Sequence, residues 1–368
     1  MAPSRREVER SLRNLEGCTV YEGHARFVAD KKVAVNGSVL DADRIFINVG
    51  GRASVPPIPG LDQVPYFTNS SMMDVDFLPA HLVILGGSYI GLEFAQIYRR
   101  FGSEVTGIEL APRLIPREDE DVSHAVAEFL KEEGIDVRVD SKVIGVEKEG
   151  NSIAVKVESA GKILQVVGTH VLVAIGRRPN TDDLGLDKAG IATDSHGYIQ
   201  VDDQLRTNVP GIWAMGDCNG RGAFTHTSWN DFEIVAANIL DNDQRRVSDR
   251  ITAYALYTDP PLGRVGMTEA DVRKTGKPAL ISTMAMEDVS RAYEKGETKG
   301  FMKILADRDN KQILGASFLG LAGDEVIHCV LDLMYAKAPY TIMQRAMHIH
   351  PTVSEFIPTM LGDLKPLQ

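Results

Sequence analysis

Residues 18–50 alternate apolar and polar positions in short runs, which is the pattern of β-strands. Turn residues such as Asn36-Gly37 separate these runs, as is typical of a β-meander. An apolar strand over 44–49 then leads into the stretch GGRASVPPIPG. Its glycines and prolines predict a break between structural segments.

The next part of the chain changes to a βαβ pattern. An apolar strand over 82–85 runs into a glycine turn, a helix is predicted over 90–101, and a second strand covers 105–108. The stretch DVSHAVAEFLKEEGIDVRV has the period of an amphipathic helix followed by a strand, with Gly134 as the helix stop. β-Hairpins are predicted from there to about residue 168.

The C-terminal part of the chain changes character again. A strand in PGIWAMGDCNG and a helix over 228–240 are followed, from about residue 250, by strands in RVGMT and FMKILAD and then by amphipathic helices. This order is typical of an α+β domain. In the helix DEVIHCVLDLMYAKA the apolar residues recur at helical spacing and are predicted to face the core. These residues are Val326, Ile327, Val330, Leu331 and Met334.

Two short stretches of the chain echo each other. DRIFINVGGRASVP and THVLVAIGRRPN are both apolar strands that end in glycine and are followed closely by arginine. The echo suggests two related nucleotide-binding domains that end in the same kind of strand. The predicted fold class is therefore α/β, with two Rossmann-like nucleotide-binding domains and an α+β C-terminal domain.

Composition narrows the class of protein. At 368 residues the chain is long enough for two or three domains. Its net charge of −11 argues against binding nucleic acid, because phosphate binding needs clustered positive charge. No apolar run approaches the roughly 20 residues of a membrane span, and the charged first residues show no secretory signal. Cys18, Cys218 and Cys329 lie far apart without CxxC or zinc-ligand spacing, which predicts a reduced, cytoplasmic protein.

The glycine turn GGSYIGLE is the first candidate site. It follows a strand, opens a helix and fits the dinucleotide-binding frame GxGxxG, with serine at the middle glycine position. The first glycine allows the sharp turn, the last allows close packing of helix on strand, and the serine hydroxyl can bond a phosphate. An ordinary βα turn is the alternative. The predicted cofactor-binding residues are Gly86, Gly87, Ser88, Tyr89, Ile90 and Gly91.

An acidic residue, Glu109, ends the second strand 23 positions after Gly86. In this place a carboxylate accepts hydrogen bonds from ribose hydroxyls and repels a 2′-phosphate. NAD is therefore preferred over NADP. Arg113 and Arg117 follow closely and could reverse this preference.

Motifs along nearly the whole chain resemble, in their order, those of the class I flavin-dependent pyridine nucleotide–disulfide oxidoreductases. This family includes dihydrolipoamide dehydrogenase, glutathione reductase and mercuric reductase. The motifs are VGGRASVPPIPG, GGSYIGLEFA, AIGRRPNTDDLGL, GIWAMGDCNG, YTDPPLGRVGMTE and MHIHPTVSEFIP. The resemblance implies FAD and NAD as cofactors. It also implies the domains: a partial FAD-binding domain over 1–77, an NAD(P)-binding domain over 78–178, a second FAD-binding segment over 179–247 and a dimerisation domain over 248–368.

The same resemblance implies which residues bind the flavin. Asp217 in MGDC would bond the ribityl or phosphate side, although it could instead be the N-cap of the next helix. His226 would lie along the flavin or be an ordinary satisfied polar residue, and Glu93 would face the flavin. The other cofactor-binding residues implied are Gly176, Gly216, Phe224 and Thr225.

Two features of this family are missing from the sequence: a further GxGxxG for the FAD adenosine and a CxxxxC redox disulfide. We therefore expect that an N-terminal piece of about 100 residues, a small domain's worth, is absent. The remaining flavin-domain strands would then expose apolar edges. The paired C-terminal cysteines of mercuric reductases are missing too, which argues against mercury reduction.

The stretch HIHPTVSEFIP near the C-terminus is the second candidate site. His350 precedes Pro351, which suits the first position of a helix, and Glu355 about a turn later could orient the imidazole. Spacing alone favours a histidine at a helix start. The resemblance instead implies that His350 and Glu355 are an acid–base pair that takes a proton from a dithiol across the interface of a C2 homodimer. His348 has no such role in the resemblance and is predicted to be structural.

The predicted function is that of an FAD-dependent NAD(P)H oxidoreductase of the disulfide reductase family, dihydrolipoamide dehydrogenase-like. It would pass electrons to a small-molecule disulfide or another acceptor. One alternative is a non-redox protein that binds NADH or dimerises without flavin turnover. Another is an NADH-dependent reductase that holds a flavin weakly and has no disulfide. The sequence does not name the substrate.

Overall fold

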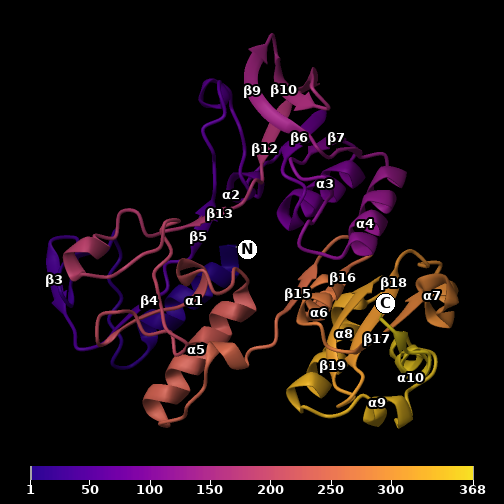
Figure 1. Ribbon diagram of the computed structural model, residues 1–368. Helices are drawn as coiled ribbons and strands as arrows, with labels where there is room; N and C mark the ends of the chain where they lie inside the picture. Colours follow the sequence, from indigo (N-terminus) through magenta and orange to yellow (C-terminus); the bar gives the residue numbers. More distant parts are fainter. Residues whose placement is uncertain (1, 368) are drawn as a thin grey trace. The chain divides into compact units, whose positions relative to one another are not determined.

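The structure is a computed structural model that describes residues 2–367 (Figure 1). The chain divides into two compact units, each built from two separate stretches of sequence. The first unit contains the chain up to Arg52 and residues 177–250, and the second contains residues 53–176 and the chain from Ile251 onward. Among the described residues, no helix is long and apolar enough to cross a membrane.

The nucleotide-binding part of the second unit is a four-stranded parallel sheet with the strand order β12-β6-β7-β8. Parallel neighbours need crossover connections, and the helices α3 and α4 belong to them. Leu82 and Val83 are neighbours on β6 and are both fully buried, as expected for a sheet that is covered on both faces. The predicted βαβ pattern is confirmed. The elements are β6 (His81–Leu85), α3 (Tyr89–Phe101), β7 (Glu104–Ile108), α4 (Glu120–Glu132), β8 (Asp136–Arg138) and β12 (His170–Val173).

A three-stranded antiparallel sheet lies between β8 and β12 in the sequence, where hairpins are predicted. Its middle strand pairs on both sides, with Val155 opposite Val146 and Val166. The same valines share an apolar cluster with Val83 and Leu85 of the parallel sheet, so the two sheets pack through one core. The elements are β9 (Lys142–Glu149), β10 (Ser152–Ser159) and β11 (Lys162–Gly168), with a 3₁₀ turn (Leu61–Gln63) and α2 (Asn69–Met72) preceding β6.

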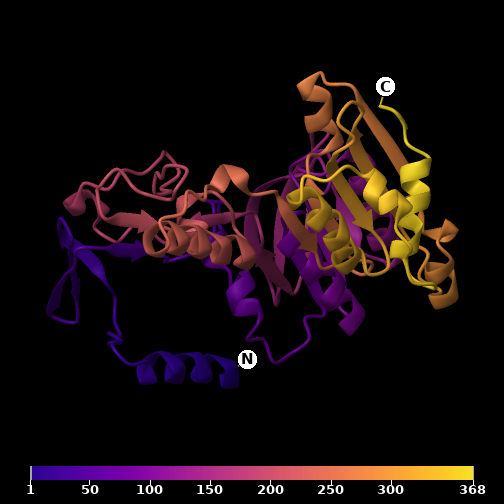
Figure 2. The same cartoon turned by 90° about the horizontal axis from the view of Figure 1, so that it is seen from below.

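The C-terminal part of the second unit is a six-stranded antiparallel sheet in the order β15-β16-β19-β18-β17-β20. Figure 2 shows C-terminal helices, in yellow, against these strands. On α8, Ile327 and Val330 are buried and the other three predicted core residues pack partly buried against the same cluster, which confirms the predicted core face. The elements are β15 (Ala253–Leu256), β16 (Leu262–Gly266), α6 (Glu269–Thr275), β17 (Ala279–Ala285), a 3₁₀ turn (Met286–Asp288), α7 (Ser290–Lys295), β18 (Phe301–Asp307), β19 (Ile313–Leu319), α8 (Gly323–Tyr335), α9 (Thr341–Arg345), a 3₁₀ turn (Ser354–Phe356), α10 (Ile357–Gly362) and β20 (Lys365–Pro366).

The first unit contains the predicted meander and two small two-stranded sheets. Strands β1, β2 and β3 are antiparallel neighbours, β4 pairs in parallel with β14, and β5 pairs with β13, so the ends of the two echoing stretches lie side by side. The elements are α1 (Ala2–Asn14), β1 (Arg26–Ala29), β2 (Lys32–Val35), β3 (Ser38–Asp41), β4 (Ile45–Ile47), β5 (Gly51–Ala53), β13 (Arg177–Pro179), a 3₁₀ turn (Leu186–Ala189), β14 (Ile212–Ala214), a 3₁₀ turn (Gly216–Asn219), α5 (Thr225–Leu240) and a 3₁₀ turn (Val247–Asp249).

The N-terminal prediction is wrong in one respect. The alternating pattern predicts strands from residue 18 onward, but residues 18–25 form no strand and α1 precedes them. These residues are almost all exposed. Alternation alone does not make a strand, because a strand also needs a neighbouring backbone to accept and donate its hydrogen bonds.

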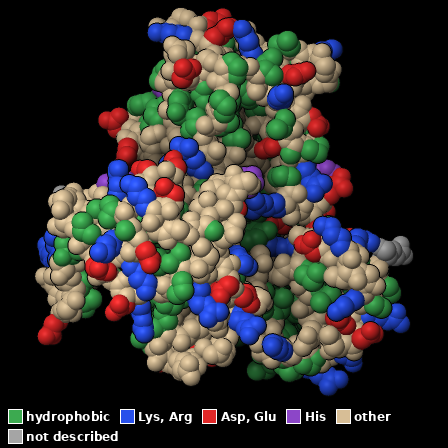
Figure 3. Space-filling model, turned by 60° about the vertical axis from the view of Figure 1, so that its left-hand side comes forward, with side chains coloured by type: hydrophobic (Ala, Val, Ile, Leu, Met, Phe, Trp, Pro, Cys, Tyr) green, Lys and Arg blue, Asp and Glu red, His purple; other side chains and the backbone are tan. Residues whose placement is uncertain are grey.

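Apolar side chains are exposed around β4 and α5. Phe46 is 45% exposed and stacks on Trp213 of β14, with ring centroids 5.1 Å apart. Trp229 and Phe232 on α5 are also exposed, and their rings lie 5.3 Å apart. These four aromatic side chains form two ring pairs in the first unit, and three of the four side chains are exposed. On the face that Figure 3 presents, basic and acidic side chains are interspersed.

Leu130 on α4 tests the core of the parallel sheet, because it is fully buried among the side chains that join the sheet to its helices. Leu130→Ala removes buried methyl groups and leaves a cavity, so it should lower the free energy of unfolding by about 2–5 kcal/mol. Urea unfolding followed by circular dichroism measures this change. The control Ile163→Ala, at an exposed position on β11, should change it by less than about 0.5 kcal/mol. Equal losses in the two variants would contradict this description of the core.

Candidate functional site

The predicted dinucleotide turn lies between β6 and α3, and its outer glycines have no room for a side chain. Gly86 has a φ of +112°, and a Cβ there would lie 2.3 Å from the carbonyl oxygen of Ala174. A Cβ on Gly91 would lie 2.1 Å from the carbonyl oxygen of Gly86. Only glycine fits these positions, and the absence of side chains lets the helix approach the strand as the motif requires.

The start of α3 offers hydrogen-bond donors to an anion. Ser88 is the N-cap residue with an extended backbone, and its side chain makes no capping bond. The first amides of a helix have no intrahelical acceptor and lie at the positive end of the helix dipole. The turn therefore fits the pyrophosphate of a dinucleotide, with Gly87, Tyr89 and Ile90 as its remaining residues.

Glu109, which directly follows β7, forms a hydrogen bond with the turn. Its Oε2 accepts a hydrogen bond from the Gly87 amide at 2.6 Å, and its Oε1 accepts one from the Ala111 amide at 2.7 Å. Arg113 donates instead to the carbonyl oxygens of Pro116 and Glu118, at 3.2 and 3.4 Å. The nearest arginine in the sequence is therefore engaged within its own loop.

Two hydrogen bonds of the helix after the turn involve an acidic side chain. Tyr89, the first residue of α3, donates its hydroxyl to Glu118 at 2.8 Å. Burial and the negative charge of Glu118 raise the pKa of Tyr89, so the phenol stays protonated. Glu93 accepts a hydrogen bond from the Tyr257 amide at 3.0 Å, and burial raises the pKa of Glu93. The implied role of Glu93 beside a flavin stays a prediction.

The predicted flavin-side acid, Asp217, lies in the first unit within the 3₁₀ turn Gly216–Asn219. Its Oδ2 accepts a hydrogen bond from Arg177 at 3.2 Å. The alternative reading of Asp217 as the N-cap of α5 is wrong, because Phe224 stands at that position. Gly216 has a φ of +68° and donates its amide to Asp231 at 2.9 Å, which fixes the turn that presents Asp217.

The other predicted flavin-side residues belong to both units. Phe224 and His226 stack with ring centroids 5.2 Å apart at the start of α5, and Thr225 between them is exposed. Gly176 belongs to the second unit, where it has a φ of +134° and its carbonyl accepts a hydrogen bond from the Ser54 amide at 2.9 Å. Their roles toward a flavin stay predictions.

His350 and Glu355 are in direct contact. The Nδ1 of His350 lies 3.1 and 3.0 Å from the two carboxylate oxygens of Glu355. The imidazole is 73% exposed whereas the carboxylate is 18% exposed, so a partly buried acid orients an accessible base. The predicted helix start at Pro351 is wrong: the first helical turn begins at Ser354. Glu355 instead also accepts from the Thr352 amide at 3.3 Å, which closes the loop without a helix.

The three cysteines are free and do not form a redox pair. Cys218 is fully buried, and burial raises the pKa of its thiol to about 11. Burial also raises the pKa of Cys329, and Cys18 is exposed. Thiols with raised pKa values are poor nucleophiles at neutral pH. Among the described residues, no group of histidine, cysteine or acidic side chains is placed to hold a metal ion.

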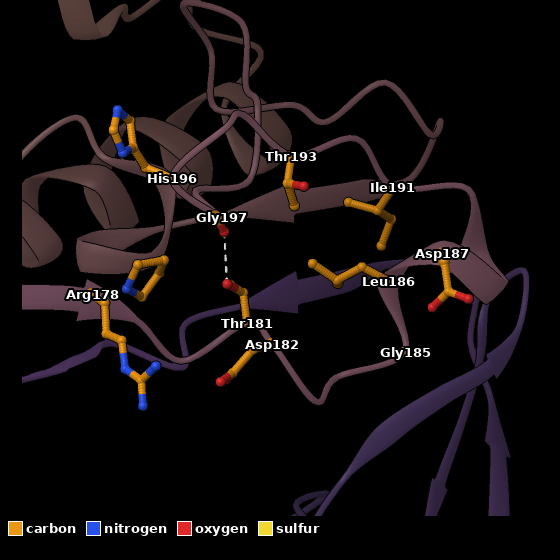
Figure 4. A pocket seen from close by; sticks show the side chains of 11 residues that line it. Arg178, Thr181, Asp182, Gly185, Leu186, Asp187, Ile191, Thr193, His196 and Gly197 are labelled. Atoms are coloured by element: carbon orange, nitrogen blue, oxygen red, sulfur yellow. Dashed lines mark hydrogen bonds between the residues drawn. The ribbon is translucent and has the colours of Figure 1, made fainter. Parts of the chain in front are cut away.

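A surface pocket of about 350 Å³ in the first unit contains none of the predicted site residues (Figure 4). Arg178 and His196 line it together with Asp182, while Thr181 donates its hydroxyl to the Gly197 carbonyl at 2.6 Å. The lining mixes both signs of charge, so the pocket does not select for an anion such as a phosphate.

A buried charge cluster is the main feature that the sequence pattern did not reveal. Arg264 on β16 and Lys303 on β18 are each only 1% exposed. Lys303 lies 2.8 Å from Asp121 and 3.0 Å from Asp119, and Arg264 lies 3.6 Å from Asp119. The cluster therefore joins the nucleotide-binding and C-terminal sheets of the second unit. A single basic residue inside each apolar strand, in LGRVG and FMKIL, is the signal that could have found it.

The parallel sheet, its glycine turn and Glu109 together define a dinucleotide-binding protein. Comparison with known proteins gives the family. The profile described as pyridine nucleotide-disulphide oxidoreductase matches residues 4–231, and the profile of the dimerisation domain of that family matches residues 252–361. The chain belongs to the pyridine nucleotide-disulphide oxidoreductase family, whose members are FAD- and NAD(P)-dependent oxidoreductases. The predicted family, fold class and cofactors are confirmed, while the four predicted domain ranges stay predictions.

Two relatives, one of them with a solved structure, illustrate the similarity. The chain is 35% identical to the probable pyridine nucleotide-disulfide oxidoreductase RclA of Escherichia coli, over 96% of this chain and 81% of that protein. It is 33% identical to mercuric reductase of Streptomyces lividans, over 92% of this chain and 72% of that protein. A solved structure of the HOCl-induced flavoprotein disulfide reductase RclA from E. coli matches with a TM-score of 0.91 and 34% identity, over 97% of this chain and 82% of that one. These coverages do not support the expected absence of an N-terminal piece.

Gly91→Ala tests the turn. The added Cβ would collide with the Gly86 carbonyl, so α3 must move away from the turn, and the affinity for NADH should fall at least about tenfold, or 1.4 kcal/mol. Fluorescence titration with NADH measures it. Gly107→Ala on β7 is the matched control, since a Cβ there meets nothing within 4 Å, and its affinity should be unchanged. Unaltered binding by Gly91→Ala would contradict the site.

Lys303→Met tests the buried cluster. It removes the cation nearest to Asp119 and Asp121 and leaves Asp119 only the more distant Arg264, so the free energy of unfolding should fall by about 3–5 kcal/mol in urea titrations. The control Lys274→Met removes an exposed ion pair with Asp271 and should cost less than about 1 kcal/mol.

The stability that the same cluster contributes should fall at acidic pH. Burial alone would raise the pKa of Asp119, but the Glu269 amide and the charge of Lys303 lower it overall. The stability contributed by Asp119 is therefore present above its ordinary pKa and is lost as pH falls through the lowered value. Acidification should destabilise the parent chain more than Lys303→Met, and an equal acid response in both would contradict this coupling.

Proposed function

We propose that the chain is an FAD-dependent NADH oxidoreductase, a flavoprotein disulfide reductase of the dihydrolipoamide dehydrogenase-like kind. The observation that carries the proposal is the turn between β6 and α3. Gly86 and Gly91 exclude side chains, and the amides at the start of α3 offer donors to a pyrophosphate.

NADH rather than NADPH is the proposed electron donor. Glu109 places a carboxylate at the end of β7, beside the turn, where it would accept bonds from ribose hydroxyls and repel a 2′-phosphate. The positive charge of Arg113 could have attracted a 2′-phosphate, but its guanidinium donates hydrogen bonds to carbonyl oxygens of its own loop.

Asp217 is proposed to hold the flavin. One of its oxygens accepts from Arg177, and the other is left to accept from a hydroxyl of the ribityl chain. FAD, when bound, supplies the capacity to accept a hydride and pass electrons on. Gly216, Phe224 and Thr225 are proposed neighbours of the same cofactor, and Gly176 is proposed to contact a cofactor from the second unit.

The His350–Glu355 pair is the proposed acid–base group. A carboxylate 3.0 Å from Nδ1 selects the tautomer whose Nε2 can take a proton, and it stabilises the imidazolium that results. In the proposed C2 homodimer this exposed imidazole would exchange a proton with a substrate dithiol across the dimer interface, and the electron acceptor would be a small-molecule disulfide. The match of residues 252–361 to the dimerisation domain supports this assembly.

A second candidate is a protein that binds NADH or dimerises without flavin turnover. The state of the cysteines favours it, because Cys18, Cys218 and Cys329 are all unpaired and two of the thiols have raised pKa values. A third, an NADH-dependent reductase with a weakly held flavin, would need no disulfide either.

The absorption spectrum of the purified full chain separates these candidates. A yellow protein whose flavin band is bleached by NADH and restored by lipoamide supports the disulfide reductase. A band that NADH bleaches and only other acceptors restore supports the third candidate. A colourless protein that still quenches or shifts NADH fluorescence supports the second, and a chain that does neither contradicts all three.

His350→Ala tests the acid–base pair. Losing a positioned base should lower NADH-dependent lipoamide reduction at least about 100-fold, whereas the rate of flavin reduction by NADH should stay unchanged. Stopped-flow absorbance separates the two steps. His348→Ala is the matched control, because His348 faces the Ala346 carbonyl rather than an acid, and it should alter neither rate. Full lipoamide turnover in His350→Ala would rule out the assigned role.

A further inference from the structure

One face of α3 lies along the segment 254–259 of the C-terminal domain. Glu93 accepts from the Tyr257 amide at 3.0 Å. The side-chain amide of Gln96 accepts a hydrogen bond from the Asp259 amide at 2.7 Å and donates one to the Asp259 carbonyl at 2.8 Å. Arg100 donates a hydrogen bond to the Asp259 carboxylate at 2.6 Å. Residues spaced by three and four positions share a helix face, so the helix that begins at the dinucleotide turn is held along its length by another domain of the same unit.

The contact nearest the turn is made through a buried carboxylate. Glu118 Oε1 accepts hydrogen bonds from the hydroxyls of both Tyr89 and Tyr254, at 2.8 and 2.6 Å. The two aromatic rings meet edge to face, with centroids 5.6 Å apart. Burial and the charge of Glu118 raise the pKa of Tyr254 as they do that of Tyr89, so both phenols remain donors.

Arg264 places a positive charge beside the buried carboxylate of Glu118. Glu118 is 2% exposed, and its Oε2 has no hydrogen-bond partner among the described residues. The guanidinium Nη1 of Arg264 lies 3.9 Å from that oxygen, and the same nitrogen donates to Ser317. A buried carboxylate requires such compensation. Tyr254 on β15 and Arg264 on β16 therefore both act on Glu118 from the C-terminal domain.

We propose that Tyr254 and Arg264 are positioning residues for NADH, which act through Glu118 and Tyr89 to hold the turn over 86–91 in the conformation that binds the dinucleotide. The inference rests on the proposed NADH site and adds to it that the C-terminal domain sets NADH affinity. The physical reason is preorganisation: Tyr89 directly follows Ser88 in the chain, so a fixed Tyr89 side chain limits the conformations of the turn before the ligand arrives.

Tyr254→Phe removes one hydroxyl and keeps the ring. We expect the dissociation constant for NADH, measured by fluorescence titration of the full chain, to rise about three- to tenfold, because a hydrogen bond to a charged group is lost. Tyr98→Phe is the matched control. Tyr98 is a buried tyrosine on the same helix, and its hydroxyl donates to the Met72 carbonyl at 3.4 Å, away from the turn. Its NADH affinity should stay within twofold of the parent.

A double-mutant comparison separates positioning from general destabilisation. Glu118→Gln and Tyr254→Phe interrupt the same path, so the double variant should bind NADH no more weakly than Glu118→Gln alone. Urea unfolding of Tyr254→Phe and Tyr98→Phe provides the second readout. Similar losses of stability with different NADH affinities support positioning.

The outcomes against the inference are distinct from those against the function. If the parent binds NADH and Tyr254→Phe binds it within twofold, the inference fails and the proposed function stands. Equal weakening by Tyr98→Phe, or fully additive effects in the double variant, also overturns the inference. A parent chain that binds no NADH overturns the proposed function and the inference together.

Discussion

Two almost fully buried cations, Arg264 and Lys303, are the constraint on which the second unit depends. Removing an ion from water is costly unless opposite charges and hydrogen bonds replace its hydration. The carboxylates that do so, Glu118 and Asp119, directly precede α4 in the nucleotide-binding part, with Asp119 as the N-cap of that helix, whereas the cations come from the C-terminal sheet. Neither set of charges is compensated without the other, so the two sheets must fold against each other.

This constraint connects stability with the nucleotide site. The dinucleotide turn is made of backbone, and its geometry depends on where α3 lies relative to β6. At its first turn, helix α3 can approach the glycine turn closely because Gly91 has no side chain. Along one face the helix is fixed by the hydrogen bonds of Glu93, Gln96 and Arg100. The buried acid Glu118 then ties the first residue of the helix to the charge cluster. The same interactions that hold the domains together thus keep the turn in shape.

Much of the fold could be predicted from the chain because it depends on local pattern. The period of apolar residues located β6, α3, β7 and α4 to within a residue or two. The spacing of Gly86 and Gly91 predicted a tight turn, and the structure leaves no room for a side chain at either position. The contact of His350 with Glu355 also agrees with the predicted pair. Two predictions failed because a neighbouring segment decides the outcome: residues 18–25 have no partner strand, and Pro351 does not begin a helix. The alternative reading of Asp217 as the N-cap of α5 is also wrong, because Asp217 lies in its own 3₁₀ turn. The helix α1 was not predicted.

The sequence by itself determined the βαβ pattern, the glycine turn with its acidic residue and the resemblance to a flavoprotein family. Each of these depends on residues that lie close together in the chain. Only the tertiary structure decided that Glu118 meets both Tyr89 and Tyr254. It also decided that Lys303, in an apolar strand, faces acids on α4 and that Glu109 bonds the amide of Gly87. Such contacts join residues far apart in the chain, and which buried charge finds which partner depends on how the sheets pack. That packing is a property of the whole unit, and no local pattern encodes it.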